Sequence, residues 1–543
     1  MPESLQSFDD SSASRTSGPV YDVIIVGAGV SGGVFANSLA GCGLRILMIE
    51  KGKHYTHHKT DFAENEMAMW ERAWPNQQYE VTGNAFSGAP NFGMGVGGGS
   101  LVWTAVSLRF MAHDFRMLST YGRLAGANLA DWPFDISELT PFYEQAEQEL
   151  GVAGSPMPWP GQRNRAFPFP AFDLYRSSQR MQQGMNQLGL LSHPGPVAIA
   201  SRNTPQRNAC LHCGFCRSSC RIDAKFQADH VLISPLVKSQ QVTLITNAEV
   251  LRLTQGARAD VVNGVEIVDR STGQKQQVRG RLVLVCNNPL ETPRLFLNSA
   301  NAAHPNGLGN DHDLVGRNLF GHVGVIGTAL TNDCLETGIG YNMGNLLTLD
   351  RAFPQSSQDY VGGYVLETLN GAGAGVLAVD PLRNLWGKPL KDAMRAYNDS
   401  LFAVSFGEGV PTLDNRVKLS KRATDAWGMA QGAIDYTWHD NDLKVYDAAK
   451  RTMEQVFAAA GSQRINTNPS PFEAHLAGTM RMGQDPSTSV TNPFGKVHGL
   501  ANVYVGGASQ FVSGSSVNPT LTLYALALRT AKHLQRRFGW TRA

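Results

Sequence analysis

The chain has 543 residues, of which 42% are hydrophobic and 17% charged, so it can bury a large core divided over two or more structural units. Its 47 basic and 45 acidic residues give a net charge of +2, which excludes a global electrostatic drive toward nucleic acid or membrane surfaces. No stretch approaches 18 uninterrupted apolar residues, so no transmembrane segment is expected. We expect residues 1–19, which are rich in serine, to form a disordered tail without a recognisable export signal.

The first predicted elements are a strand, a tight turn and a helix. Residues 21–26 are apolar, GAGVSG follows at 27–32, and a helix-compatible stretch continues to residue 39. In such a turn Gly27 permits the bend, Gly29 lets the backbone approach a pyrophosphate, and Gly32 lets the helix pack closely on the strand. The positive N-terminus of the helix favours a bound anion.

A second strand brings an acid to the same place. Residues 44–49 are apolar and lead into Glu50, which lies 18 residues after Gly32. A carboxylate at this position can accept hydrogen bonds from both hydroxyls of a ribose and would repel a 2'-phosphate. A glycine triplet alone is weak evidence in a chain with 56 glycines, but the two strands and the acid together predict a dinucleotide site.

The middle of the chain supplies further elements in order. The glycine-dense segment 91–100 is suited to lying flat against a planar ligand. Residues 140–151 predict an amphipathic helix, with a proline in the first turn and a glycine at the end. Residues 242–246 and 282–286 predict two more strands of the nucleotide-binding sheet. From about residue 315 to 468 the pattern changes to alternating strands and long loops, which is typical of a sheet that covers a substrate.

Four of the seven cysteines lie close together, at Cys210, Cys213, Cys216 and Cys220. Their C-x2-C-x2-C-x3-C spacing is that of iron-sulfur ligands, and four soft thiolates within 11 residues can surround one small volume. A structural zinc ion, a pair of disulfides, or unligated thiols are the alternatives. His212 lies inside the run and is left without a role.

From residue 21 onward the chain resembles the glucose-methanol-choline (GMC) oxidoreductase family, whose members bind FAD and oxidise alcohols. The resemblance rests on the glycine turn with Glu50, GGGSLVW at 97–103, VGRNL at 315–319, HLAGT at 475–479 and SVNPTLT at 516–522. It implies an α/β fold, with a Rossmann-like FAD-binding domain and a substrate-binding domain built on a mainly antiparallel sheet. The boundaries expected on this basis are 20–314 for the FAD-binding domain with a cysteine insertion at about 205–225, 315–470 for the substrate-binding domain, and 471–543 for a return to the first domain.

That last segment carries the catalytic pair that the resemblance implies, His475 and Asn518. A neutral imidazole can remove the proton of a hydroxyl group while a hydride leaves for flavin N5. Asn518 can donate an amide hydrogen bond to the developing oxyanion but cannot replace the base. Taken alone, His475 would be one of 14 histidines with a structural role, and the motif is what favours catalysis.

The resemblance also implies how FAD is held. Residues 504–508 resemble a second flavin-contacting turn, and the helix that begins near Thr520 would point its N-terminus at the pyrimidine edge. Some carbohydrate-oxidising relatives carry a histidine before the matching tryptophan that bonds covalently to the flavin; this chain has Val102 before Trp103, so we expect non-covalent FAD. The predicted FAD contacts are Gly27, Gly29, Val30, Ser31, Gly32, Glu50, Lys51, Gly97, Gly98, Ser100, Thr104, Val250, Gly507, Ala508, Asn518, Pro519 and Thr520.

The cysteine segment resembles that of the catalytic subunits of bacterial multi-subunit sugar and gluconate dehydrogenases in this family, where a 3Fe-4S centre relays electrons from FAD. Cys210, Cys216 and Cys220 match the three ligands of those proteins, whereas Cys213 departs from their pattern. Arg221 stands where ferredoxins favour proline. We therefore expect an iron-sulfur cluster, with 3Fe-4S favoured over 4Fe-4S.

Together these features predict an FAD-dependent dehydrogenase that oxidises a hydroxyl of a sugar, polyol or sugar acid and passes electrons to cytochrome c or a quinone-linked acceptor. The resemblance further implies a small companion subunit and a periplasmic location reached through it; without such a partner the location would be cytoplasmic. Two alternatives stay open: an FAD-dependent oxidase that reduces dioxygen, and a non-catalytic flavin redox sensor whose cysteines respond to oxidation.

Overall fold

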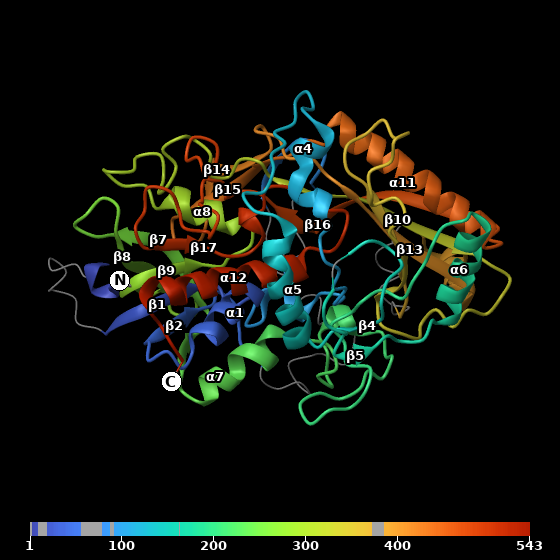
Figure 1. Ribbon diagram of the computed structural model, residues 1–543, viewed down its shortest axis with the longest axis horizontal. Helices are drawn as coiled ribbons and strands as arrows, with labels where there is room; N and C mark the ends of the chain where they lie inside the picture. Colours follow the sequence, from blue (N-terminus) through green and yellow to red (C-terminus); the bar gives the residue numbers. More distant parts are fainter. Residues whose placement is uncertain are drawn as a thin grey trace.

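The computed structural model describes residues 3–8, 19–55, 79–86, 92–161, 163–371 and 385–542. A mainly parallel sheet occupies one end of the molecule and an antiparallel sheet the other (Figure 1). The strands are β1 (Val20–Val26), β2 (Ile46–Ile49), β3 (Glu80–Thr82), β4 (Ala153–Gly154), β5 (Phe169–Pro170), β6 (Val242–Ile245), β7 (Ala248–Gln255), β8 (Val262–Asp269), β9 (Lys275–Val285), β10 (Phe320–Leu330), β11 (Met343–Thr348), β12 (Tyr364–Leu369), β13 (Ser400–Glu408), β14 (Arg416–Thr424), β15 (Ala430–Asp435), β16 (Arg464–Ala477) and β17 (Val503–Val505). The helices are α1 (Val30–Leu39), α4 (Met117–Tyr121), α5 (Ile136–Leu150), α6 (Arg176–Gln187), α7 (Ser234–Lys238), α8 (Glu291–Asn298), α10 (Gly387–Arg395), α11 (Asp440–Ala459) and α12 (Thr520–Phe538).

The first sheet has the strand order β6-β2-β1-β9-β8-β7, and β17 also pairs with β9. β1 runs parallel to β2 and β9, with Val23 opposite Ile46 and Leu282. Alternate residues of β1 enter two cores: Val23 packs in the core that includes α1 and α12, and Ile24 in the core that includes α8. The continuous apolar runs that predicted these strands follow from burial on both faces. The antiparallel β7–β8 hairpin has no counterpart among the predicted elements.

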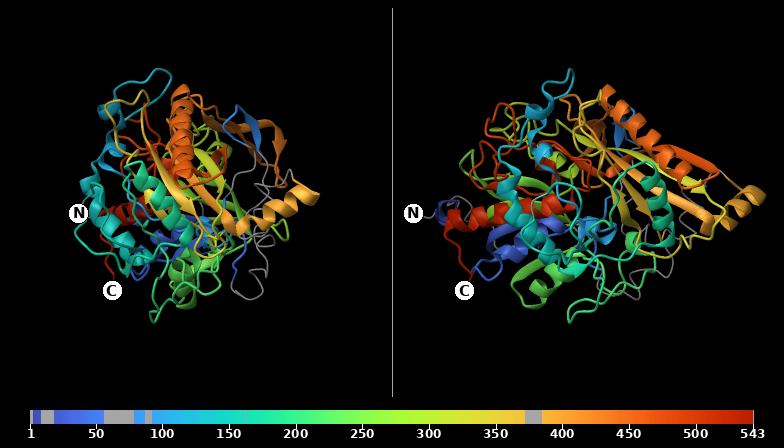
Figure 2. Two further views of the ribbon diagram at one scale, coloured as in Figure 1. Left: turned by 90° about the vertical axis from the view of Figure 1, so that its right-hand side faces the viewer. Right: turned by 45° about the vertical axis from the view of Figure 1, so that its right-hand side comes forward.

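The second sheet has the order β11-β12-β13-β10-β16 and is antiparallel. One face of this sheet packs on α11 and α6, because Val325 of β10, Ala403 of β13 and Val445 of α11 belong to one core. The sheet, α6 and α11 lie together at one end of the molecule (Figure 2). The other face carries Ile326 and Val404, which turn toward the first sheet and line a cavity between the two. The predicted fold class, a parallel Rossmann-like sheet joined to an antiparallel sheet, is confirmed.

Two small sheets complete the fold. β14 and β15 form an antiparallel pair that β3 joins in parallel to β15, and β4 pairs with β5. Among the helices in the described ranges, none has the length and apolarity needed to cross a membrane.

Two expectations from the sequence are corrected. The helix predicted at 140–151 begins earlier, at Ile136, directly after Asp135 in extended backbone, so Pro141 lies inside the helix and not in its first turn. Gly151 ends it with a φ of 64°, as predicted. Within the expected disordered tail, Leu5–Phe8 instead form a short 3-10 turn, in which Phe8 is buried and packs edge-on against Phe538 at 6.3 Å. Residues 9–18 of that tail lie outside the described ranges.

Candidate active site

The carboxyl ends of the parallel strands meet at one edge of the first sheet, where ligands bind in open α/β sheets. After β1 the chain turns at Gly27, whose φ is 99° and whose amide donates to the Ile49 carbonyl at 2.8 Å. After β17 it turns again at Gly507, with a φ of 90°. The two glycine turns expected to contact a dinucleotide therefore lie at the same edge.

Close packing explains the glycines of the first turn. A Cβ at Gly32 would lie 2.1 Å from the Gly27 carbonyl oxygen, so only glycine lets α1 sit this close to the turn. A Cβ at Gly98 would lie 2.8 Å from the Gly29 Cα, which places the glycine-dense segment directly against the turn. Gly97 joins the two by donating to the Ala28 carbonyl at 2.8 Å.

Glu50 is buried at the end of β2 and orders the surrounding backbone. One carboxylate oxygen accepts from the Ala28 amide at 2.9 Å, and the other accepts from Gly52 at 2.8 Å and Gly95 at 3.3 Å. Burial raises the pKa of Glu50, while these amides and Lys51 act in the opposite direction. Since each carboxylate oxygen can accept more than one bond, ribose hydroxyls can still be accommodated.

A cavity of about 450 Å³ starts at this edge and continues to the antiparallel sheet. Apart from Gly32 and Gly97, which serve the packing of the turn, all the predicted FAD contacts line it, and so do both predicted catalytic residues. Val102 and Trp103 line it as well. The structure thus brings together segments that are separated by almost the whole length of the chain.

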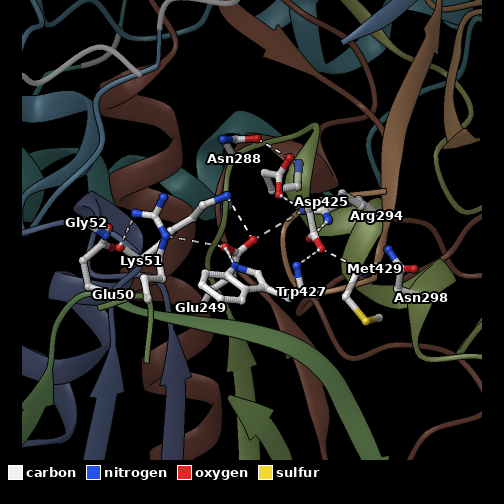
Figure 3. A network of polar contacts seen from close by, with 12 residues as sticks. Glu50, Lys51, Gly52, Glu249, Asn288, Arg294, Asn298, Asp425, Trp427 and Met429 are labelled. Carbon is white, nitrogen blue, oxygen red and sulfur yellow. Dashed lines mark hydrogen bonds and ion pairs between the residues drawn. The ribbon is translucent and has the colours of Figure 1, made fainter. Parts of the chain in front are cut away.

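A charged network borders the cavity near Glu50 (Figure 3). Lys51 pairs with Glu249 at 3.0 Å, and Arg294 bonds Glu291 at 2.9 Å and pairs with Asp425 in the loop between β14 and β15. Burial alone would raise the pKa of Glu291, but Lys51 and Arg294 lower it to about 2. The network fastens the β14–β15 loop over this end of the cavity through ion pairs. Of its members, only Lys51 was expected at the site.

At the other end, an irregularity in β16 presents His475. Phe320 pairs with Ala477, whereas His322 pairs with Phe472, so residues 473–476 lie opposite Gly321 alone. Such a bulge takes side chains out of the regular ladder and re-aims them. Residues 473–476 all line the cavity.

His475 has a second histidine as its partner. Its Nδ1 lies 3.0 Å from Nδ1 of His322, and His322 Nε2 lies 2.7 Å from the Ser515 carbonyl oxygen. The Phe472 ring packs against His475 with centroids 4.5 Å apart. Burial lowers the pKa of His475 well below its usual value and lowers that of His322 to about 4. Both rings are therefore neutral at pH 7. His322 was not predicted, because a single histidine in an apolar strand has no distinguishing pattern.

Asn518 lies just before α12 and is 4% exposed. Its Oδ1 is buried without a hydrogen-bond partner among the described residues, and the side chain lines the cavity. A buried polar atom without a partner costs free energy, so a ligand group that could bond to it would be stabilised here. Asn518 and His475 offer an amide and an imidazole to the same space.

The cysteine segment approaches the cavity from a third direction. Arg217 lines the cavity, while Cys216 is buried, Cys210 and Cys220 are partly buried, and Cys213 is exposed. All four are free thiols, which argues against the disulfide alternative. In the described part of the chain, no three or more His, Cys, Asp or Glu side chains are arranged to hold a metal ion, so neither a zinc site nor an iron-sulfur cluster is shown.

Comparison with known protein families matches residues 21–324 and 411–527 to GMC oxidoreductases. The chain belongs to this family. It is 31% identical to 6'''-hydroxyparomomycin C oxidase from Streptomyces lividus, over 97% of this chain and 94% of the relative. It is 27% identical to the fructose dehydrogenase large subunit from Gluconobacter japonicus, over 94% of this chain and 97% of the relative. The GMC oxidoreductase also shares its fold with pyridoxine 4-oxidase from Mesorbium loti, with a TM-score of 0.65, 17% identity, and coverage of 95% of this chain and 99% of that one.

Membership in the family makes this GMC oxidoreductase an FAD-dependent enzyme that acts on alcohol groups. The cavity fits that cofactor. The glycine turn and Glu50 can hold its pyrophosphate and ribose, and the N-terminus of α12 faces the cavity through Thr520.

Proposed function

We propose that this GMC oxidoreductase is a dehydrogenase that oxidises a hydroxyl group of a sugar, polyol or sugar acid. The observation that carries the proposal is that His475 and Asn518 open into the same cavity as the dinucleotide-binding turn. Bound FAD would supply the hydride acceptor. The chain itself supplies a base, a hydrogen-bonding amide and a largely apolar wall.

The residues that line the cavity would have different roles in the reaction. His475 is neutral and can take the proton of the substrate hydroxyl. The Asn518 side chain can hydrogen-bond to the substrate oxygen as negative charge develops on it. Phe472 packs on the imidazole and, together with Ile326 and Val404, forms an apolar wall of the cavity. This wall limits the access of water to the reacting groups.

The substrate class is tested by mixing the FAD-loaded protein anaerobically with fructose, gluconate, glucose, sorbitol and 6'''-hydroxyparomomycin C while following flavin absorbance. We expect at least one of these compounds to bleach the flavin. If all of them leave a fully FAD-loaded protein oxidised, the sugar-dehydrogenase proposal is wrong. The redox-sensor alternative would then gain support.

Dioxygen is the alternative electron acceptor, because two relatives at 31% identity are named oxidases. The reduced enzyme from the same experiment distinguishes the two cases. We expect cytochrome c or a quinone analogue to reoxidise it faster than air-saturated buffer does. Rapid reoxidation by dioxygen with stoichiometric peroxide would assign an oxidase.

We propose further that Cys210, Cys216 and Cys220 hold an iron-sulfur cluster, with 3Fe-4S favoured over 4Fe-4S. Burial raises the pKa of Cys210 to about 11 and that of Cys216 to about 12, so only a strongly bound cation would displace their protons at pH 7. Two buried cations, Arg207 and Lys225, lie near Cys220 and would offset the negative charge of thiolates. A cluster there would supply one-electron transfer to an external acceptor.

Lys225 also connects the cysteine segment with the cavity wall. Its ammonium lies 2.7 Å from the Cys216 carbonyl oxygen and 3.0–3.1 Å from the carbonyl oxygens of Ser100, Leu101 and Trp103. Ser100 and Trp103 line the cavity. The proposed cluster would therefore adjoin the backbone that contacts FAD, as an electron relay requires.

Replacing Cys216 by serine tests the cluster. We expect Cys216→Ser to lose bound iron and most electron transfer to cytochrome c while it retains FAD and flavin reduction by the substrate. The matched control is the variant Cys213→Ser, which changes the exposed thiol. This variant should retain iron if only the other three cysteines ligate the cluster. Unchanged transfer to the acceptor in Cys216→Ser would contradict the relay.

The fructose dehydrogenase relative is named as a large subunit. We propose that this chain likewise works with a small companion subunit and a cytochrome c subunit or other acceptor, at the periplasmic face of the membrane. Purification from cells that express the chain with and without a candidate companion tests this. Full cofactor loading and acceptor transfer by the chain expressed alone would argue against a required companion.

The pH dependence of flavin reduction follows from the burial of His475. A base is inactive when protonated, so activity is lost as the pH falls through the pKa of the base in the folded enzyme. Because that pKa lies well below the usual 6.5, we expect the rate of flavin reduction to stay constant from pH 7 to below pH 6.5. A stopped-flow pH profile with an acid limb centred at 6.5 or higher would contradict a buried neutral base.

A further inference from the structure

In the pair His322 and His475, the surrounding groups determine which ring nitrogen donates a hydrogen bond and which accepts one. The Ser515 carbonyl oxygen can only accept a hydrogen bond, and it lies 2.7 Å from His322 Nε2. His322 therefore carries a proton on Nε2. Because a neutral imidazole carries one proton, Nδ1 of His322 has a free lone pair that points toward His475.

The proton on His322 Nε2 also determines the direction of the hydrogen bond between His322 and His475. His475 Nδ1 lies 3.0 Å from Nδ1 of His322, so the hydrogen in this contact must come from His475. A neutral His475 that is protonated on Nδ1 has its lone pair on Nε2. We propose that His322 is a positioning residue that holds His475 in the tautomer whose Nε2 can accept the proton of the substrate hydroxyl. This inference rests on the proposed function.

The packing around His322 supports a positioning role. It is 6% exposed and does not belong to the cavity lining, so it acts on the substrate only through His475. Its ring lies over Phe406 with centroids 5.2 Å apart and meets the His475 ring at 89°. Opposite it, the bulge of β16 gives His475 no regular ladder position. The hydrogen bond to His322, together with the packing of Phe472 and Phe406, therefore sets the orientation of the catalytic ring.

The arrangement also suits the protonated form of His475. When Nε2 takes the substrate proton, the Nδ1 proton continues to donate to His322, so neither ring has to turn. A hydrogen bond that is already formed before the proton moves costs no reorganisation during the reaction. The proton is held at His475 Nε2, and His322 stays neutral.

The test compares two substitutions at one position, with the FAD-loaded enzyme and the best reductant of the sugar panel. His322→Phe keeps a ring of similar shape but removes the acceptor, and His322→Asn keeps an acceptor near the place of Nδ1. We expect His322→Phe to slow flavin reduction about 10²-fold with little change in substrate KM, and His322→Asn to recover most of the rate. As a control, His304→Phe replaces another buried histidine, 2.8 Å from the Ala259 carbonyl oxygen and outside the cavity lining, and should reduce flavin like the wild type.

Two results would overturn the inference: a wild-type rate in His322→Phe, or equally slow rates in both variants at full FAD content, which would mean that only the native ring is accommodated. Nitrogen NMR of histidine-labelled protein gives a readout independent of activity, because the tautomer of His475 should be single in the wild type and mixed in His322→Phe. A protonated Nε2 in the wild type would also contradict the inference. If the wild-type enzyme were not reduced at all by the panel, the proposed function would fail instead.

Discussion

His475→Ala is expected to lower the rate of flavin reduction by the best alcohol substrate about 10³-fold, while FAD remains bound at wild-type stoichiometry. The imidazole lines the cavity and is neutral and able to take a proton at pH 7. It lies on the bulge of β16, away from the glycine turn and Glu50, so its removal should leave the dinucleotide contacts intact. Anaerobic stopped-flow absorbance measures the rate, and the visible spectrum measures FAD content.

A second histidine serves as the control for this substitution. His533 lies on α12, and its ring stacks on Phe494 at 3.9 Å rather than facing the cavity. His533→Ala should reduce flavin at the wild-type rate. An equal loss of rate in both variants, or a wild-type rate in His475→Ala, would remove His475 from the mechanism.

Gly32→Ala is expected to abolish FAD binding. The added Cβ would lie 2.1 Å from the Gly27 carbonyl oxygen, a contact that no side-chain rotation can relieve because the backbone fixes the positions of both atoms. Either α1 moves away from the turn or the turn opens, and both changes displace the amides that would face the pyrophosphate. The measurement is the ratio of flavin to protein after purification and after incubation with excess FAD.

The neighbouring glycine offers a matched control in the same helix. A Cβ at Gly33 would meet the flexible ends of Leu232 at 3.3 Å and Ile233 at 3.4 Å, which can shift by a few tenths of an ångström. Gly33→Ala should therefore retain FAD. Loss of FAD in both variants would point to a general effect on α1, and full FAD in Gly32→Ala would disprove the close-packing role of this glycine.

Local sequence patterns were sufficient to predict an element or a site when all the residues that define it lie in one short segment. β1, β2 and the C-terminal part of β9 were predicted because strands buried on both faces are continuous apolar runs. The exposed first half of β9 was not predicted. The cavity lining around Gly27 and Glu50 could be predicted because the turn, its helix and the acid lie within 24 residues of each other. The start of α5 was misplaced because Pro141 was taken as a first-turn residue when it lies further inside the helix.

Long-range pairing accounts for what the sequence did not predict. His322 and His475 are separated by 153 positions and meet only because β10 pairs with β16. The bulge that aims His475 is a feature of how β10 pairs with β16, two strands that lie far apart in the sequence. The network around Arg294 likewise joins α8, β7 and the β14–β15 loop, which contact one another only in the folded chain.

The central claim is that one cavity couples the oxidation of a hydroxyl group to the reduction of bound FAD. The most direct test is an anaerobic titration of the FAD-loaded protein with the best compound of the sugar panel, with the carbonyl product quantified alongside flavin absorbance. We predict that flavin is bleached and that the carbonyl product formed accounts for all the electrons taken up by flavin and any bound iron. Flavin that stays oxidised in the presence of every compound, or bleaching without a carbonyl product, would contradict the account.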